Sequence, residues 1–108
     1  MVAETSSVTL ELHGPLAQRF AEVGRRHGSR TRVDITSAPG ETVGGLLARL
    51  AETDQRYTSL YDPAAERLPE HVEAVLNDRV LDLQGGLAAR LSPGDVLSFL
   101  PAHAGGFF

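Results

Sequence analysis

Cysteine, lysine and tryptophan are all missing from this chain of 108 residues, in which all ten basic residues are arginine. Without cysteine the chain can form no disulfide, no thiolate metal site and no thiol nucleophile. Without lysine it offers no ε-amine that could accept an isopeptide bond. Any sulfur chemistry that involves this chain therefore needs sulfur from another molecule.

Long apolar runs are also absent. No run could span a bilayer, and Met1 to Leu12 has neither the basic segment nor the apolar segment of a signal peptide. We therefore expect a cytoplasmic protein with no membrane partner. The formal net charge of −4 argues against a nucleic-acid partner, which would require a cationic surface.

One basic cluster, Arg25, Arg26, Arg30 and Arg32, departs from this acidic balance. Glycine and serine residues interleave the four arginines, a composition that is typical of a turn. We interpret the cluster as a solvated hairpin connection in preference to a phosphate-binding patch. A chain of this length forms one domain, which buries roughly 65% of the surface of its unfolded state.

Alternation of apolar and polar residues predicts strands over 8–12 and 32–36, which are antiparallel to each other, with a short helix over 16–23 between them. The clearest helix begins after Thr42, whose hydroxyl can cap it, and ends near 52–54. Its apolar stripe consists of Val43, Leu46, Leu47 and Leu50. Residues 55–70 are predicted to form a long loop with one helical turn.

The last third of the chain is predicted to contain three strands, over 71–76, 79–83 and 96–100. Asn77-Asp78 forms the hairpin turn between the first two, because both residues tolerate the left-handed conformation. Gly85-Gly86 is a second turn. Ser92-Pro93-Gly94-Asp95 is a third, with Pro93 presetting φ and Gly94 supplying a positive φ. Pro101 then ends the ladder of the final strand.

These elements predict an α+β fold, a mixed sheet of about five strands packed on one main helix. Residues 1–101 would form the domain and residues 102–108 a flexible tail. Leu97 and Phe99 should point into the core, with Leu100 on the opposite face of the sheet. That outward apolar residue, together with Val80 on a neighbouring strand, is either ordinary rim packing or part of a docking surface.

The tail Pro101-Ala102-His103-Ala104-Gly105-Gly106-Phe107-Phe108 has no helical or strand periodicity and few large side chains before its end. Gly105 and Gly106 lack Cβ atoms and can thread a narrow cleft that would reject larger residues. A chain that ended at Gly106 would present an unhindered carboxylate, able to attack a nucleotide phosphate. Phe107 and Phe108 block that chemistry in the chain as it stands.

Three segments together carry a resemblance to a known family: Val75-Leu76-Asn77-Asp78-Arg79-Val80, the run from Leu91 to Pro101, and Gly105-Gly106. They resemble the ubiquitin-like β-grasp sulfur carriers, particularly the MoaD branch, the small subunit of molybdopterin synthase, and its relative ThiS. The order of elements is similar over nearly the whole chain. The specific motifs lie in the last third, where turn chemistry and tail are independent signals.

The resemblance implies a carrier without catalysis of its own and with no bound cofactor. A partner, an adenylating enzyme that uses ATP, would activate the carboxylate of Gly106, and a sulfur donor would convert it to a thiocarboxylate. A sulfur-accepting synthase would take up that sulfur. The resemblance also makes Val80 and Leu100 the candidate positions for contact with partners.

The two phenylalanines after the diglycine depart from the usual pattern. A subset of these carriers bears a short extension, which a JAMM-type metalloprotease removes, and we expect Phe107-Phe108 to be such a processing extension. The simpler alternative is that these phenylalanines end a degenerate tail or pack on the domain. A mature carrier would end at Gly106.

The remaining residues give no sign of an enzyme or a metal centre. The four histidines, His13, His27, His71 and His103, are dispersed without ligand spacing, and no glycine-rich phosphate loop is present. Two hypotheses therefore remain: a sulfur carrier, or a β-grasp module that binds partners non-covalently through its sheet. Within the carrier class, molybdopterin synthase ranks first as acceptor, and a carrier dedicated to cysteine or specialised metabolites ranks second.

Overall fold

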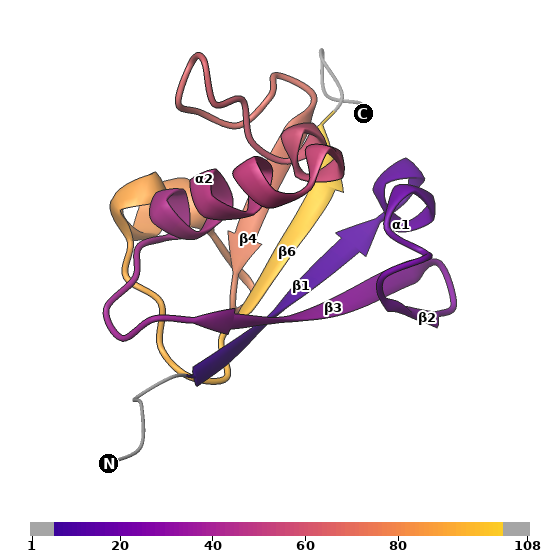
Figure 1. The fold of residues 1–108 in the computed structure, drawn as a ribbon, viewed down its shortest axis with the longest axis horizontal. Coiled ribbons are helices and arrows are strands. Elements are labelled where there is room, and N and C mark those ends of the chain that lie inside the picture. Colours follow the sequence, from indigo (N-terminus) through magenta and orange to yellow (C-terminus); the bar gives the residue numbers. More distant parts are fainter. Residues whose placement is uncertain (1–5, 103–108) are drawn as a thin grey trace.

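The computed structural model describes residues 6–102, which form one sheet with a main helix against one of its faces (Figure 1). The elements in chain order are β1 (Ser6–His13), α1 (Pro15–Arg19), β2 (Arg25–His27), β3 (Arg30–Ser37), α2 (Val43–Thr53), η1 (Gln55–Ser59), β4 (Val72–Leu76), β5 (Arg79–Val80), η2 (Leu81–Gln84), η3 (Gly86–Ala88) and β6 (Val96–Pro101). None of the helices in residues 6–102 has the length and hydrophobicity that a bilayer-spanning segment needs.

The sheet has six strands in the order β2-β3-β1-β6-β4-β5. The central pair β1 and β6 is parallel, and every other neighbouring pair is antiparallel. The α+β architecture and the antiparallel pairing of the first two predicted strands are confirmed. The extra strand is β2, which the expected count of about five omits, because its three residues are all exposed and show no apolar alternation.

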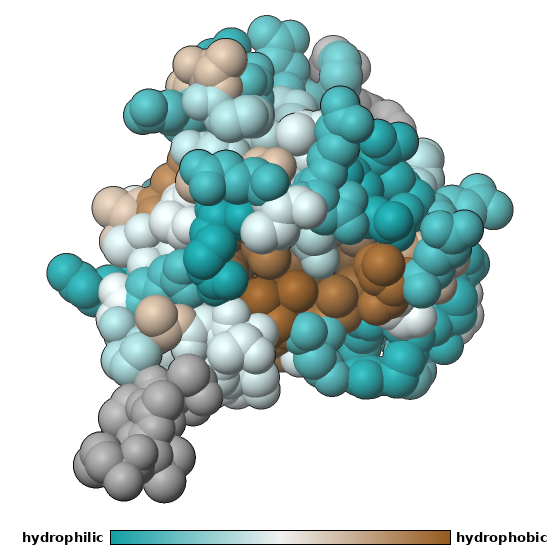
Figure 2. All heavy atoms as spheres, in the orientation of Figure 1, coloured by the Kyte–Doolittle hydropathy of each residue, from teal (hydrophilic) through white to brown (hydrophobic). Residues whose placement is uncertain are grey.

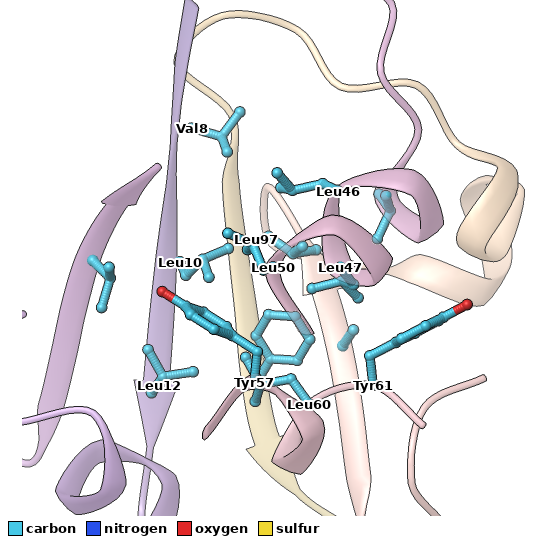
Figure 3. Close-up of a cluster of buried hydrophobic side chains, with 14 of the residues drawn as sticks. Val8, Leu10, Leu12, Leu46, Leu47, Leu50, Tyr57, Leu60, Tyr61 and Leu97 are labelled. Carbon is cyan, nitrogen blue, oxygen red and sulfur yellow. The ribbon is translucent and has the colours of Figure 1, made fainter. Parts of the chain in front are cut away.

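The main helix α2 has the expected start and stripe. Thr42 caps it, accepting a hydrogen bond on Oγ1 from the backbone N–H of Gly45 at 3.0 Å. The four apolar residues of the predicted stripe are all buried, and Figure 3 shows Leu46, Leu47 and Leu50 beside Leu10 and Leu97 of the central strands. The helix and the inner face of the sheet thus enclose one core.

The short helix is shorter than predicted. It ends at Arg19 instead of reaching residue 23, and single turns continue the chain, with Val23 N donating to Phe20 O at 3.1 Å. Phe20 is fully buried, but Val23 is 44% exposed, so the apolar spacing that predicts a longer helix is incidental.

The side of the molecule that faces the viewer in Figure 1 is mostly hydrophilic. Figure 2 shows one apolar strip on it, which lies over the sheet beside α2.

The strand predicted over 79–83 pairs at only two residues. Leu81, the first residue of η2, turns inward and is only 2% exposed. The Gln84 side chain then closes the turn, because its Nε2 donates to the carbonyls of Leu76 at 3.0 Å and Arg79 at 2.9 Å. Burial of Leu81 therefore replaces strand pairing here.

The turn residues behave as the sequence predicts. Asn77 and Asp78 have φ values of 52° and 71°, and Gly94 has a φ of 83°. Asn77 also joins the two turns, donating from Nδ2 to Asp95 Oδ1 at 2.9 Å and accepting on Oδ1 from Val96 N at 2.8 Å. The hairpin motif and the proline-glycine-aspartate motif thus stabilise each other at one end of the sheet.

β6 ends at Pro101, one residue beyond its predicted end, and Pro101 itself still belongs to the ladder. It pairs with Val72, and Ala102 N donates to His71 O at 2.7 Å. Backbone N–H groups of successive residues in a strand point to opposite neighbouring strands. Because the N–H of Ala102 points toward β4, the nitrogen of Pro101 points toward β1. The parallel pairing of β1 with β6 ends at Leu12 and Phe99, so the missing N–H of Pro101 removes no bond from the ladder.

Candidate functional site

The predicted sulfur-bearing tail begins where the described structure stops. Gly105, Gly106, Phe107 and Phe108 all lie outside the described residues 6–102, so their roles stay predictions. Ala102, the last described residue, follows β6 directly. The surroundings of Ala102 and of the final strand are therefore the part of the candidate site that the structure defines.

A glycine that follows β1 makes room for Pro101, the residue at which the tail leaves the sheet and which we call the tail root. Gly14 has a φ of 62° and a ψ of −136°, a backbone conformation that side chains strongly disfavour. A Cβ at Gly14 would lie only 3.2 Å from Cγ of Pro101. The turn after β1 therefore packs directly against the proline from which the tail departs.

Val80 and Leu100 both lie on the face of the sheet that α2 does not cover, which we call the outer face. Leu100 is half-buried on β6, and Val80 is 38% exposed on β5. The two strands are separated by β4, a lateral distance of about 10 Å. Val75 of β4 is half-buried and lies opposite both Val80 on one side and Ser98 on the other. It links the two predicted positions into one apolar surface.

A hollow of about 300 Å³ opens on the outer face next to this apolar surface. Its lining comes from four strands and the hairpin turn: Glu11, His13, Arg30, Val75, Asp78, Ser98 and Leu100. Val75 and Leu100 give the hollow an apolar part, and Glu11, His13 and Arg30 give it a charged part, with Ser98 between them and Asp78 at the hairpin-turn end. We call it the outer hollow.

Glu11 is the centre of the charged part of the hollow. Although it lies on the face away from the helix, it is only 6% exposed. Arg32, directly across on β3, donates from Nε to Oε2 at 2.8 Å, and Arg30 approaches the same oxygen at 3.5 Å. The other carboxylate oxygen contacts His13 Nε2 at 3.1 Å and the Ser98 hydroxyl at 3.4 Å. Three strands therefore meet at one carboxylate.

This network keeps Glu11 ionised. Burial is the largest single influence and acts to raise its pKa, but the hydrogen bonds from Arg32 and His13 and the charges of Arg32 and Arg30 outweigh it. The pKa of Glu11 is consequently held below its ordinary value. A paired, ionised carboxylate in this place fixes the positions of both arginines.

The basic cluster lies on the β2–β3 hairpin, but its four arginines are on the two paired strands and not in the connection, which is the turn at Gly28 and Ser29. Strand alternation and pairing divide its arginines between the faces: Arg25, opposite Arg32, shares the outer face, and Arg26, opposite buried Thr31, does not. Arg25 contacts Asp34 at 2.9 Å, and both side chains are largely exposed. Arg26 donates to the carbonyl of Gly28 at 3.3 Å.

A second hollow, of about 210 Å³, lies at the edge of β4 on the other side of the tail root. Leu68, Val72, Val80 and Ala102 are among the residues that line it, with carboxylates at its rim. Val80 thus borders both the outer face and this edge. Within residues 6–102, no three histidine, aspartate or glutamate side chains gather as a metal site would require.

Sequence reasoning missed Glu11, His13, Arg30 and Val75 as parts of this site. Alternation in the first strand does place Glu11 on the other face of the sheet from Leu10 and Leu12. It cannot reveal which side chains contact the carboxylate. The partners come from β3 and from β6, whose Ser98 is 87 positions away. Only the strand order and register bring them together.

Comparison with known proteins links the chain to one family. The ThiS family model matches residues 19–106 of the chain. The sulfur carrier protein CysO of Mycobacterium tuberculosis is 35% identical over 72 residues, which cover 65% of this chain and 77% of the relative.

Solved structures extend the similarity to nearly the full fold. The crystal structure of SAMP1 from Haloferax volcanii has a TM-score of 0.64 at 25% identity and covers 94% of this chain and 100% of its own. A chain of the Amycolatopsis orientalis BexX/CysO complex has a TM-score of 0.58 at 26% identity, and the match covers 90% of this chain and 99% of that chain. The ubiquitin-like β-grasp fold is thus confirmed. The chain therefore belongs to the ThiS family, as its resemblance to the MoaD/ThiS-type sulfur carriers predicts.

Proposed function

We propose that this protein carries sulfur as a thiocarboxylate on Gly106 after Phe107 and Phe108 have been removed. The observation that carries the proposal is the extent of the family match, which ends at Gly106 and leaves the two phenylalanines beyond it. Gly106 stands four residues after Ala102, the residue that directly follows β6. Four extended residues span about 13 Å, enough to carry Gly106 into a partner's cleft.

The chemistry proceeds in three steps, each catalysed by a partner. A JAMM-type metalloprotease adds water across the Gly106–Phe107 peptide bond, which leaves a carboxylate on Gly106 and releases the Phe-Phe dipeptide. An activating enzyme then lets that carboxylate attack the α-phosphorus of ATP, and pyrophosphate leaves. Finally, hydrosulfide attacks the acyl carbon and AMP departs, forming the thiocarboxylate.

The domain itself supplies recognition. Val80 and Leu100 are proposed to contact the activating enzyme and the sulfur-accepting synthase, because both lie on the outer face near the tail root. The tether keeps the sulfur from diffusing away and presents it at high effective concentration. In this function the protein is a substrate and carrier for enzymes and not an enzyme.

The similarity to CysO favours a particular class of acceptor. The curated relatives are sulfur carrier proteins named CysO, and one similar structure is a complex of CysO with BexX. These matches move a carrier dedicated to cysteine or specialised metabolites ahead of the molybdopterin synthase subunit. Both acceptors require the same thiocarboxylate on Gly106.

Intact mass spectrometry tests the proposal. The full chain, a chain truncated after Gly106 and a chain truncated after Gly105 are incubated with lysate of the source cell, ATP and sulfide. We expect the full chain to lose two phenylalanines and then exchange one oxygen for sulfur. The chain ending at Gly106 should gain sulfur directly, and the chain ending at Gly105 should gain it poorly.

Two omissions separate the steps. Chelation of zinc should block loss of the phenylalanines but leave sulfur transfer to the truncated chain intact, and omission of ATP should do the reverse. If the chain ending at Gly106 never gains sulfur, the non-covalent interaction module becomes the better description. If it gains sulfur while the full chain stays intact, the proposed removal of Phe107-Phe108 is wrong.

A further inference from the structure

We propose that the outer hollow and the arginines of the β2–β3 hairpin form a docking site for an acidic protein segment that also carries apolar side chains. The proposal adds a cationic half, Arg25, Arg30 and Arg32, to the apolar surface of Val75, Val80 and Leu100. It deepens the proposed carrier function by naming the chemistry of the partner's surface, and it rests on that function only for the partner's role.

Charge is distributed unevenly over the molecule. The outer face of β1, β2 and β3 carries three arginines, which only two carboxylates, Glu11 and Asp34, accompany. The chain as a whole has a net charge of −4, so this half of the face is basic against an acidic remainder. Such an asymmetry orients an acidic partner during encounter.

The arginines of this face are more exposed than the carboxylate that they contact. The Glu11 side chain is only 8% exposed, whereas those of Arg30 and Arg32 are 47% and 42% exposed. A partner therefore meets guanidinium groups, with the compensating carboxylate beneath them. Arg32 binds Glu11 through Nε, and Arg30 lies 3.5 Å from it, so most of the N–H groups that a guanidinium offers stay available.

The cationic half of the site is continuous with the apolar half. Arg30 and His13 line the outer hollow on one side, and Val75 and Leu100 line it on the other. Two exposed carboxylates border the apolar half: Asp78 disfavours an acidic group at the hairpin-turn end of the hollow, and Glu73, opposite Leu100 on β4, disfavours one on the β4 side. The site thus fits a segment whose apolar side chain enters beside Leu100 and whose carboxylates lie toward Arg30 and Arg25.

Glu11 acts in this site as a positioning residue. It draws together side chains from β1, β3 and β6, and a flat sheet surface would otherwise leave the two arginines free to point into solvent. Ordering them beforehand reduces the conformational entropy that a partner's binding would have to offset. The buried carboxylate of Glu11 thus contributes to partner recognition as well as to the stability of the fold.

Nuclear magnetic resonance titration with two defined peptides tests the site. The acetylated peptide amide Glu-Leu-Glu-Phe-Glu is compared with Gln-Leu-Gln-Phe-Gln, which has nearly the same shape without charge. At low salt we expect the acidic peptide to shift the amides of Glu11, Ser98 and Leu100 and to bind at least about fivefold more tightly than the neutral peptide. Added salt should remove most of that difference.

The hairpin supplies a matched pair of variants. Arg30→Glu and Arg26→Glu change the net charge equally within the same hairpin, but only Arg30 lines the outer hollow. We expect Arg30→Glu to weaken the acidic peptide by roughly fivefold or more and Arg26→Glu by less than about twofold. Equal losses, equal affinity for the two peptides, or shifts confined to another face would each overturn the proposal.

A second experiment separates this inference from the carrier function. Chains truncated after Gly106 with either substitution are incubated with lysate, ATP and sulfide, and the initial rate of sulfur gain is measured. Arg30→Glu should lower the rate at low salt, and the deficit should shrink at high salt. If no variant gains sulfur, the carrier function fails while the peptide titration still decides the docking site; if both gain it at equal rates, an acidic docking segment on the activating enzyme is ruled out.

Discussion

The two faces of the sheet bury their residues by different means. On β1, Leu10 is completely buried on the inner face among leucines of α2, and its neighbour Glu11 is 6% exposed on the outer face among arginines and histidine. Hydrocarbon packing tolerates any partner of suitable volume. A carboxylate requires donors at defined distances, so the outer face holds its side chains in specified positions.

This difference assigns separate roles to neighbouring residues of one strand. On β6, Leu97 and Phe99 are fully buried on the inner face, whereas Ser98 and Leu100 are half-buried on the outer face beside the outer hollow. The inner face should therefore dominate the free energy of unfolding. The outer face should dominate recognition by partners, with smaller effects on stability.

The largest effect is expected when the inner face is broken. Phe99→Ala removes a fully buried ring and should lower the free energy of unfolding by about 3–5 kcal/mol. The adjacent change Leu100→Ala should cost less than about 1 kcal/mol, because that side chain is already half-exposed. Urea unfolding of both variants measures the difference. Similar losses would show that the two faces do not divide as proposed.

A smaller loss is expected from Glu11→Gln on the outer face. The variant removes the negative charge that Arg32 and Arg30 accompany, so we expect a loss of about 1–3 kcal/mol at neutral pH. Glu22→Gln, at an exposed position, is the control and should change the stability little.

The same variant should flatten the acid dependence of stability. The pKa of Glu11 is lower in the folded chain than its ordinary value of 4.5, so its contribution is complete above that value and is lost as pH falls through the lower folded pKa. Urea unfolding across the acid range should therefore show a shallower decline for Glu11→Gln than for the unaltered chain. Identical slopes would mean that Glu11 is not held in its charged form.

A loss of stability smaller than that from Glu11→Gln is expected at the Asn77-Asp78 turn, at the end of the sheet. Asn77 combines a φ of 52° with hydrogen bonds to Asp95 and Val96, so Asn77→Ala should cost about 1–2 kcal/mol. Asp78→Ala, at a φ of 71°, tests the backbone contribution alone and should cost less. Thermal unfolding of both variants checks the order, and a larger loss from Asp78→Ala would contradict it.

The inner face was predictable from sequence because its signals are local. The α2 stripe, the Thr42 cap and the outward or inward alternation of β6 all follow from residues within one element, and the structure confirms them. The Asn77-Asp78 turn was equally predictable, because few residues adopt positive φ. Such signals do not depend on the rest of the fold.

The outer site was not predictable to the same extent, because its parts come from distant strands. The arginine cluster was recognisable as a hairpin, but its division between faces depends on the register of β2 with β3. The sequence predicts only that Glu11 faces away from the core. Its contacts become evident once β3 and β6 are placed beside β1. Exposed β2 was missed for a related reason, since edge strands without an apolar face leave no periodic signal.

The smallest effect on stability is expected at Val80, where the recognition role can be isolated. Val80→Ser should change the free energy of unfolding by less than about 0.5 kcal/mol, since the side chain is 38% exposed. In a chain truncated after Gly106, it should nevertheless slow sulfur gain in lysate by roughly three- to tenfold, as expected for an apolar contact in an interface.

Leu83→Ser is the matched control for Val80, because Leu83 is 84% exposed and lies only three residues later, in η2 and not on a strand. If any exposed apolar side chain assisted the partner, Leu83→Ser would slow sulfur gain at least as much as Val80→Ser. We expect it to have little effect. A slower rate for Val80→Ser alone, with both variants equally stable to urea, would show that recognition depends on the outer face and not on exposed hydrocarbon in general.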